Sequence, residues 1–111
     1  MTYTLRILPA ADTDIDEAAL YIAQDSLENA LRSYDAIDTT YRLIRAHPKR
    51  WPLYKIDHPR LQGIRRRAVS GFRHYLVFCR VNDQVVEVIR VLHCARDIPA
   101  ILYNEFTDGS N

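Results

Sequence analysis

The chain has 111 residues, of which 48% are hydrophobic and 26% are charged. This length suits one domain that buries a core without metals or disulfides, and the apolar content excludes an intrinsically disordered chain. The net charge is only +1, but residues 1–40 carry two Arg against eight acids, whereas residues 60–96 carry eight Arg against two acids. The sequence therefore predicts a single domain over residues 1–111 with an acidic front and a basic back.

The sequence also bears on location and cofactors. No stretch approaches the roughly 20 apolar residues of a membrane span. The opening segment MTYTLRILPA lacks the apolar run of a signal peptide. We expect a cytoplasmic protein without membrane contact, in which Cys79 and Cys94 stay reduced. No Cys/His spacing resembles a zinc site, so we predict no metal and no other cofactor.

The first half is predicted to form one strand and two helices. Alternating apolar residues over 2–8 indicate a strand with one buried face. Apolar residues then recur at helical spacing over 10–24. A second helix, capped by Asp25 or Ser26, keeps this spacing until His47, which precedes a proline. Because almost nothing separates the two helices, they should form an antiparallel hairpin.

The second half is predicted to form three strands and a short helix. Residues 48–62 contain three prolines and are interpreted as a loop. Strands are expected over the segments 65–69, 74–81 and 85–93, followed by a helix over 98–106. The tail 106–111 should fray. The predicted fold is α+β: an N-terminal strand and a helical hairpin packed on a small, mainly antiparallel sheet, in the order β-α-α-β-β-β with a short C-terminal helix.

The two long strands are apolar on both faces, although a helical hairpin covers only one face of a sheet. An antiparallel sheet open to water on one side should alternate apolar and polar residues, and the strands 74–81 and 85–93 do not. The second face therefore needs a cover. The C-terminal helix or a segment of a partner protein could supply it, and the second alternative argues for an obligate partner.

The pair Asn82-Asp83 suits a tight turn between these strands and implies a register. Tyr75 should then lie opposite Arg90, and Cys79 near Val86. Cys79 and Cys94 would be too far apart for a disulfide.

In the same register, four basic side chains should gather around one end of the sheet: Arg73, Arg90, His93 and Arg96. Cations and a general acid and base could support metal-free RNA cleavage by 2′-OH attack. A solvated basic rim would explain the same residues without chemistry. The sequence contains no GxSxG, P-loop, CxxC or HExxH motif.

Three segments together resemble the ParE/RelE superfamily of toxins from type II toxin–antitoxin systems, over roughly residues 3–103. They are YTLRILPAADTDIDEAALYIA, LIRAHPKRWP and GIRRRAVSGFRHYLVFCRVNDQVVEVIRVLHCARDI. The ending VIRVLHCARDI is the most specific part, although Cys94 stands where the family usually has glycine. The resemblance implies a compact sheet with a helical hairpin on one face. It also implies a cognate, ParD-like antitoxin whose C-terminal segment wraps the toxin, in a class of systems that arrest growth and stabilise plasmids.

The superfamily divides by target. RelE-like members resemble ribosome-dependent mRNA endonucleases, whereas ParE-like members inhibit DNA gyrase and so block replication. Arg73 matches one catalytic Arg position of the RelE type, the second falls on Cys94, and Tyr103 matches a terminal Tyr only loosely. The incomplete set favours a non-enzymatic gyrase inhibitor. The alternative is an mRNA endonuclease acting on the ribosome and mRNA with Arg73, His93 and Arg96, and a third possibility is an antitoxin-binding module that has lost toxicity.

Two sets of binding residues follow from these hypotheses. The target-binding candidates are Arg65, Arg67, Arg73, Arg90 and Arg96. The antitoxin-binding candidates are Trp51, Tyr54, Tyr75, Val77 and Val88.

Overall fold

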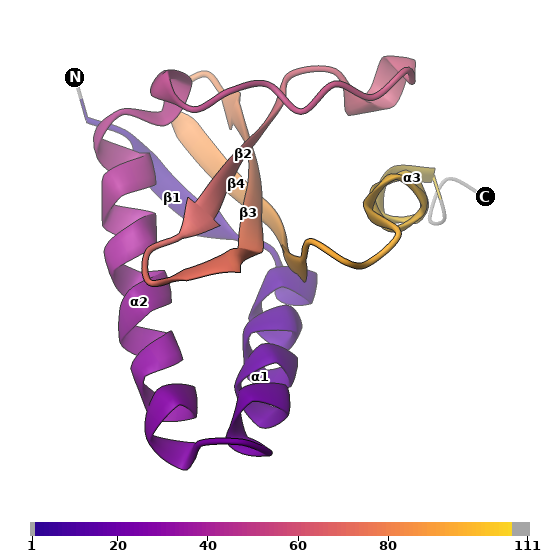
Figure 1. Cartoon of the computed structure of the whole chain (residues 1–111). Coiled ribbons are helices and arrows are strands. Elements are labelled where there is room, and N and C mark those ends of the chain that lie inside the picture. The colour runs from indigo at the N-terminus through magenta and orange to yellow at the C-terminus, as the bar shows by residue number, and fades with distance from the viewer. Residues whose placement is uncertain (1, 108–111) are drawn as a thin grey trace.

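A computed structural model describes residues 2–107 as four strands and three α-helices (Figure 1). The elements in chain order are β1 (Thr4–Ile7), α1 (Pro9–Ala23), α2 (Leu27–Ala46), β2 (Ile64–Val69), β3 (Phe72–Asn82), β4 (Val85–His93) and α3 (Ile98–Thr107). Two short 3-10 helices, η1 (Pro48–Arg50) and η2 (Pro59–Leu61), lie in the segment between α2 and β2. This order confirms the predicted α+β fold.

The strands form one sheet in the order β1-β4-β3-β2. The strand β1 pairs in parallel with β4, whereas the β4–β3 and β3–β2 pairs are antiparallel. The parallel pair forces the chain to cross from one end of the sheet to the other after β1, and the helical hairpin is part of that crossing. The sheet therefore has β1 and β2 at its two edges.

The helical hairpin forms as predicted and packs against one face of the sheet (Figure 1). Helix α1 begins at Pro9, whose fixed φ suits the first helical position. Helix α2 is capped by Ser26, whose hydroxyl accepts a hydrogen bond from the Asn29 N–H at 3.1 Å. The N-cap of α2 is therefore Ser26 and not Asp25. Helix α2 ends immediately before the His47-Pro48 pair.

Each face of the sheet has its own core. On the face toward the hairpin, helix residues such as Ile15 and Ile44 pack with Val77 and Val88. A second cluster holds Leu61 and α3 residues against sheet residues, and its fully or almost fully buried members are Leu61, Ile64, Phe78, Ile89, Leu92, Ile98 and Leu102. Because α3 and η2 cover the second face, the apolar character of both faces does not by itself require a partner.

The predicted register between β3 and β4 is wrong. Tyr75 lies opposite His93 instead of Arg90, and Cys79 lies opposite Val88 instead of Val86. The first reason is the turn, which is one residue later than predicted: Asn82 still pairs with Val85, and Asp83 takes a φ of 60° beyond it. The second reason is a bulge between Phe78 and Cys79, which shifts the pairing again.

Other boundaries differ in smaller ways. The strand β3 starts at Phe72, earlier than the predicted 74, and the segment read as a plain loop contains η1, η2 and a bridge between Leu53 and Arg65. Helix α3 continues to Thr107, so residues 106 and 107 do not fray, and the rest of the predicted tail lies outside the described residues. Both Cys79 and Cys94 are free thiols, in agreement with the predicted absence of a disulfide between them.

Candidate functional site

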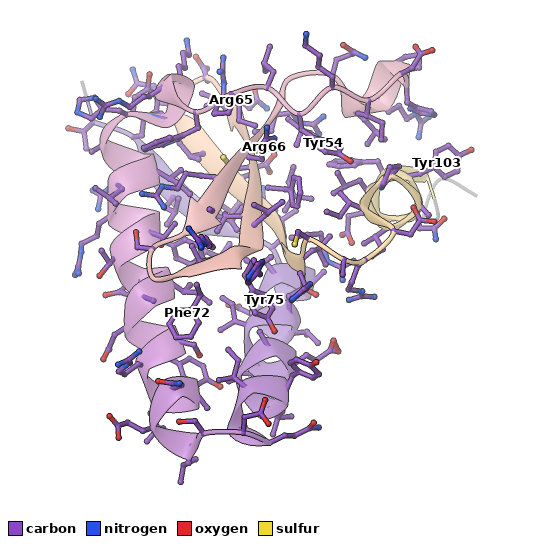
Figure 2. The ribbon with its side chains drawn as sticks, in the orientation of Figure 1. Tyr54, Arg65, Arg66, Phe72, Tyr75 and Tyr103 are labelled. Atoms are coloured by element: carbon purple, nitrogen blue, oxygen red, sulfur yellow. The ribbon has the colours of Figure 1, made fainter. Side chains whose placement is uncertain are left out.

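Two adjoining hollows lie where β3 begins and β4 ends, beside the C-terminal half of α1. They measure about 390 and 380 Å³ and share Tyr21, Tyr75 and His93. Figure 2 shows Tyr75 at this junction of the sheet with α1. Arg96 lines the first hollow and Arg73 lines the second. Three of the four side chains predicted to gather at this end of the sheet therefore do surround one place.

The ridge between the hollows is a cluster of rings. Tyr75 meets His93 edge-on with ring centroids 5.0 Å apart, and His74 stacks on His93 at 5.9 Å. The Ala95 N–H donates to Nδ1 of His93 at 3.0 Å, so a neutral His93 carries its proton on Nε2. Burial raises the pKa of Tyr75 above its ordinary value, so this phenol stays protonated. Such a ridge can stack against a planar group while the two arginines bind an anion.

Arg90, the fourth predicted side chain, is engaged elsewhere. Its Nε and Nη2 each donate to the Asp14 carboxylate at 2.7 Å, and its Nη1 lies 3.4 Å from Glu105. The hydrogen bonds to Asp14 raise the pKa of Arg90 further above its ordinary value. All three nitrogens of this guanidinium thus face carboxylates of the same chain. Arg90 ties α1 and α3 to the sheet and presents little charge to a target.

The positions that would complete a nuclease are occupied differently. Cys94 is exposed at the end of β4, with its Sγ 3.9 Å from Nδ1 of His74. Tyr103 lies on α3, away from Tyr75 (Figure 2), where its ring meets His58 edge-on at 5.0 Å. Neither Tyr103 nor Cys94 lines either hollow.

Two further target-binding candidates lie at another part of the surface. Arg65 donates to the backbone oxygen of Trp51 at 2.7 Å, and the Arg67 guanidinium lies 4.9 Å from the centre of the Trp51 ring. The Arg50 guanidinium lies 5.8 Å from the same ring. The predicted target-binding arginines are therefore divided between the hollows, the surroundings of Trp51 and the Asp14 ion pair.

The antitoxin-binding candidates also separate. Trp51, Tyr54 and Tyr75 are half-buried and keep accessible surface, and Tyr54 packs edge-on against Phe78 with ring centroids 5.2 Å apart. Val77 and Val88 are fully buried under the helical hairpin. A segment bound to the surface cannot reach these two valines, and their assignment to the antitoxin is corrected. Their strand alternation indicated an apolar face but not which helices cover it.

The sequence pattern missed an exposed apolar surface on the outside of the hairpin. Leu20 on α1 and Leu27 and Leu31 on α2 are between 62 and 70% exposed. Tyr34 is also exposed and donates to Asp16 of α1 at 2.8 Å, which joins the two helices on this side. The three-four spacing of α2 holds two parallel rows, and only the row with Ala30, Ile37 and Ile44 is buried. We call Leu20, Leu27, Leu31 and Tyr34 the outer hairpin surface.

Two negative findings apply to residues 2–107. No helix within this range has the length and apolar character needed to cross a membrane. No three His, Cys, Asp or Glu side chains of the same range are grouped so that they could hold a metal ion.

Comparison with known proteins identifies the family. Residues 5–98 match the family described as ParE toxin of type II toxin-antitoxin system, parDE. Among solved structures, a chain of the "Chromosomal ParDE TA system from P. aeruginosa" is 16% identical, with a TM-score of 0.67 over 83% of this chain and 96% of that one, which is a likeness of fold. No curated protein sequence is significantly similar. Since the matched family spans most of the sequence, this chain belongs to the ParE toxin family of type II toxin–antitoxin systems.

Proposed function

We propose that this ParE-family toxin inhibits DNA gyrase in the cytoplasm by binding it, without catalysing a reaction, and that a ParD-like antitoxin silences it. The proposal that the toxin does not catalyse a reaction is supported by the exposed thiol of Cys94 at the end of β4, where a nuclease of the related type would need a second arginine. Tyr103, the loosely matched tyrosine, packs edge-on against His58 and lines neither hollow.

The geometry of the hollows supports binding better than cleavage. Cleavage without a metal needs a base, an acid and cations converging on one phosphorus atom. Here Arg73 and Arg96 line different hollows on either side of Tyr75 and His93. Two arginines flanking a ridge of rings suit the recognition of an acidic or aromatic surface, as in many protein interfaces, where Arg and Tyr dominate the binding energy. We therefore assign gyrase recognition to Arg73 and Arg96.

Supercoiling by purified gyrase tests this proposal directly. The toxin should inhibit supercoiling, and Arg73→Ala and Arg96→Ala should each require about tenfold more toxin for the same inhibition. Arg32→Ala removes the same charge from an exposed position on α2 that lines neither hollow, and should inhibit like the unaltered toxin. Full gyrase activity at molar excess of folded toxin would overturn the proposal.

The second candidate function, mRNA cleavage, keeps one observation in its favour. Arg73, His93 and Arg96 do lie around Tyr75, so part of a cleavage set is assembled. Primer extension on translated mRNA after induction separates the two functions. Cuts at fixed codon positions that vanish in Arg73→Ala would establish the nuclease, whereas intact message together with inhibited gyrase would exclude it.

The antitoxin is proposed to cover the outer hairpin surface and the half-buried rings of Trp51, Tyr54 and Tyr75. Exposed apolar side chains in neighbouring rows, as on α1 and α2, are typical of a surface that a partner helix covers. The outer hairpin surface itself lies in the acidic part of the chain, since residues 1–40 carry eight acids and two arginines. We expect the covering segment to be an amphipathic helix with basic flanks that orders on binding.

A further inference from the structure

The middle of the chain is rich in basic residues. Residues 41–69 contain nine basic residues and a single acid, Asp57. The chain there runs from the end of α2 through η1 across the molecule to η2, on the side of α3, and then returns into β2 (Figure 1). We call this the 41–69 basic surface, and its members are Arg42, Arg45, Lys49, Arg50, Lys55, Arg60, Arg65, Arg66 and Arg67.

The positive charge of this surface is not neutralised within the chain. Arg45 donates to the backbone oxygen of Tyr3 at 2.9 Å, Arg65 to that of Trp51 at 2.7 Å, and Arg60 to that of Phe106 at 3.2 Å. A carbonyl oxygen orders a guanidinium but leaves its full charge in place. Among residues 2–107, Arg42 is the one member of the surface with an ion pair, to Asp38 at 3.2 Å.

Trp51 holds two of these like charges close together. The guanidiniums of Arg50 and Arg67 lie 5.8 and 4.9 Å from the centre of its ring. Cation–π contacts of this kind hold a cation in a fixed place without neutralising it. Keeping several like charges in one region raises the free energy of the folded protein, and a bound polyanion would lower it. The fold therefore presents an ordered array of cations whose natural complement is a row of anionic groups.

We propose that the 41–69 basic surface binds the phosphate backbone of duplex DNA. Arginine, which supplies seven of the nine cations, matches the geometry of phosphate oxygens. The Trp51 ring is already in contact with the Arg50 and Arg67 guanidiniums, so at this point the surface offers a partner positive charge.

The arrangement on β2 favours a duplex over a single strand. Arg65 and Arg67 lie opposite Cys79 and Val77, on the hairpin face of the sheet, whereas Arg66 lies opposite Phe78, on the other face. Figure 2 shows Arg65 and Arg66 next to one another at this edge. Cations on both faces of one sheet edge can meet two rows of phosphates, which a duplex has and a single strand lacks.

This inference goes beyond gyrase inhibition and does not depend on it, because DNA binding is measured with the toxin alone. A fluorescent duplex of about 30 base pairs is titrated with purified toxin between about 50 and 200 mM salt, and its anisotropy is recorded. The affinity should fall steeply with salt and depend little on DNA sequence. Lys49→Gln and Arg66→Gln, both at exposed positions, should each weaken binding several-fold and lower the slope of log K against log salt by about 1.

The control is Arg32→Gln, which removes the same charge from the acidic half of the chain and should bind DNA like the unaltered toxin. Equal melting temperatures establish that the variants are folded. No anisotropy change at the lowest salt, or an equal loss in Arg32→Gln, would overturn the proposal. So would displacement of the duplex by polyglutamate at equal charge concentration, which indicates an acidic protein partner, or tighter binding of single-stranded RNA than of the duplex.

Discussion

Asp14 on α1 and Arg90 on β4 form a buried, two-pronged ion pair, with both N···O distances at 2.7 Å. The pairing of β1 with β4 ends at Ile7 and Val88, so the next part of β4 has no strand beside it on that edge. Asp14 takes the place of the missing strand, because its carboxylate also accepts the Val91 N–H at 2.9 Å. One acidic side chain thus accepts a backbone N–H at the edge of β4 that lacks a neighbouring strand, and it holds α1 against that edge.

Replacing Asp14 should therefore destabilise the fold strongly. The Asp14 side chain is only 2% exposed, and Asp14→Asn leaves the Arg90 charge without its main partner. The free energy of unfolding in urea should fall by about 3 to 5 kcal/mol, the usual cost of breaking a buried pair. Asp38→Asn, which breaks the exposed pair with Arg42, should cost less than about 1 kcal/mol. Equal unfolding midpoints for the two variants would show that the Asp14–Arg90 ion pair stabilises the fold no more than the exposed pair does.

Arg96 should matter for toxicity and not for folding. Its side chain is exposed after the end of β4 and lines the first hollow. Arg96→Ala should change the melting temperature little, while growth arrest after induction weakens. The comparison is Leu102→Ala, which truncates a fully buried residue of α3 and should cost about 2 to 5 kcal/mol. A melting temperature lowered as far in Arg96→Ala as in Leu102→Ala would contradict the prediction.

The outer hairpin surface should be needed for neutralisation and not for toxicity. Leu31→Asp places a charge on an exposed leucine, so the fold should persist and growth arrest should remain. Co-expressed antitoxin should then fail to restore growth, since a charge would be buried against an apolar face. Leu43→Asp is the matched control, because Leu43 is also exposed on α2 but lies outside this surface. Full rescue of Leu31→Asp by the antitoxin would remove the surface from the interface.

Alkaline pH should destabilise the protein through Cys79. Burial raises the pKa of this thiol from an ordinary 9.0 to about 11. Between these two values the unfolded chain releases the proton and the folded chain keeps it. The Cys79 thiol therefore lowers the free energy of unfolding only above pH 9, and increasingly so as the pH rises. The loss from this group should be roughly 1.4 kcal/mol per pH unit.

The pH dependence of urea unfolding checks this, with Cys79→Ala as the reference. That variant lacks the thiol and should show a flatter alkaline profile, whatever its stability at neutral pH. Burial also raises the pKa of Tyr41, which acts in the same direction in both proteins. Parallel profiles for the two proteins would mean that Cys79 titrates alike in the folded and unfolded states.

Local features of the chain were predictable because they depend on neighbouring residues. The two helices follow from apolar spacing and the start of α1 from Pro9, whereas the cap of α2 was limited to Asp25 or Ser26 and is Ser26 in the structure. The strand β1 follows from its alternation, β3 and β4 follow from their apolar residues on either side of the Asn82-Asp83 pair, and the fold class follows from the order of elements. The gathering of Arg73, His93 and Arg96 was also predictable, since all three lie near one end of a hairpin of adjacent strands.

Long-range features were decided only by the folded structure. The later turn shifted every pair between β3 and β4, and the bulge between Phe78 and Cys79 shifted the pairs from Tyr75 to Phe78 once more, because periodicity says nothing about an inserted residue. The sequence does not distinguish the two apolar rows of α2. Only the packing of α2 against the sheet shows which row is buried and that Leu27 and Leu31 are exposed. The partner of Arg90 lies 76 residues away in the sequence. The sequence by itself determined the elements, their order and the division of charge. Packing between distant segments decided the register, the cover of the second face and which arginines keep their charge free, because those depend on contacts that no local pattern encodes.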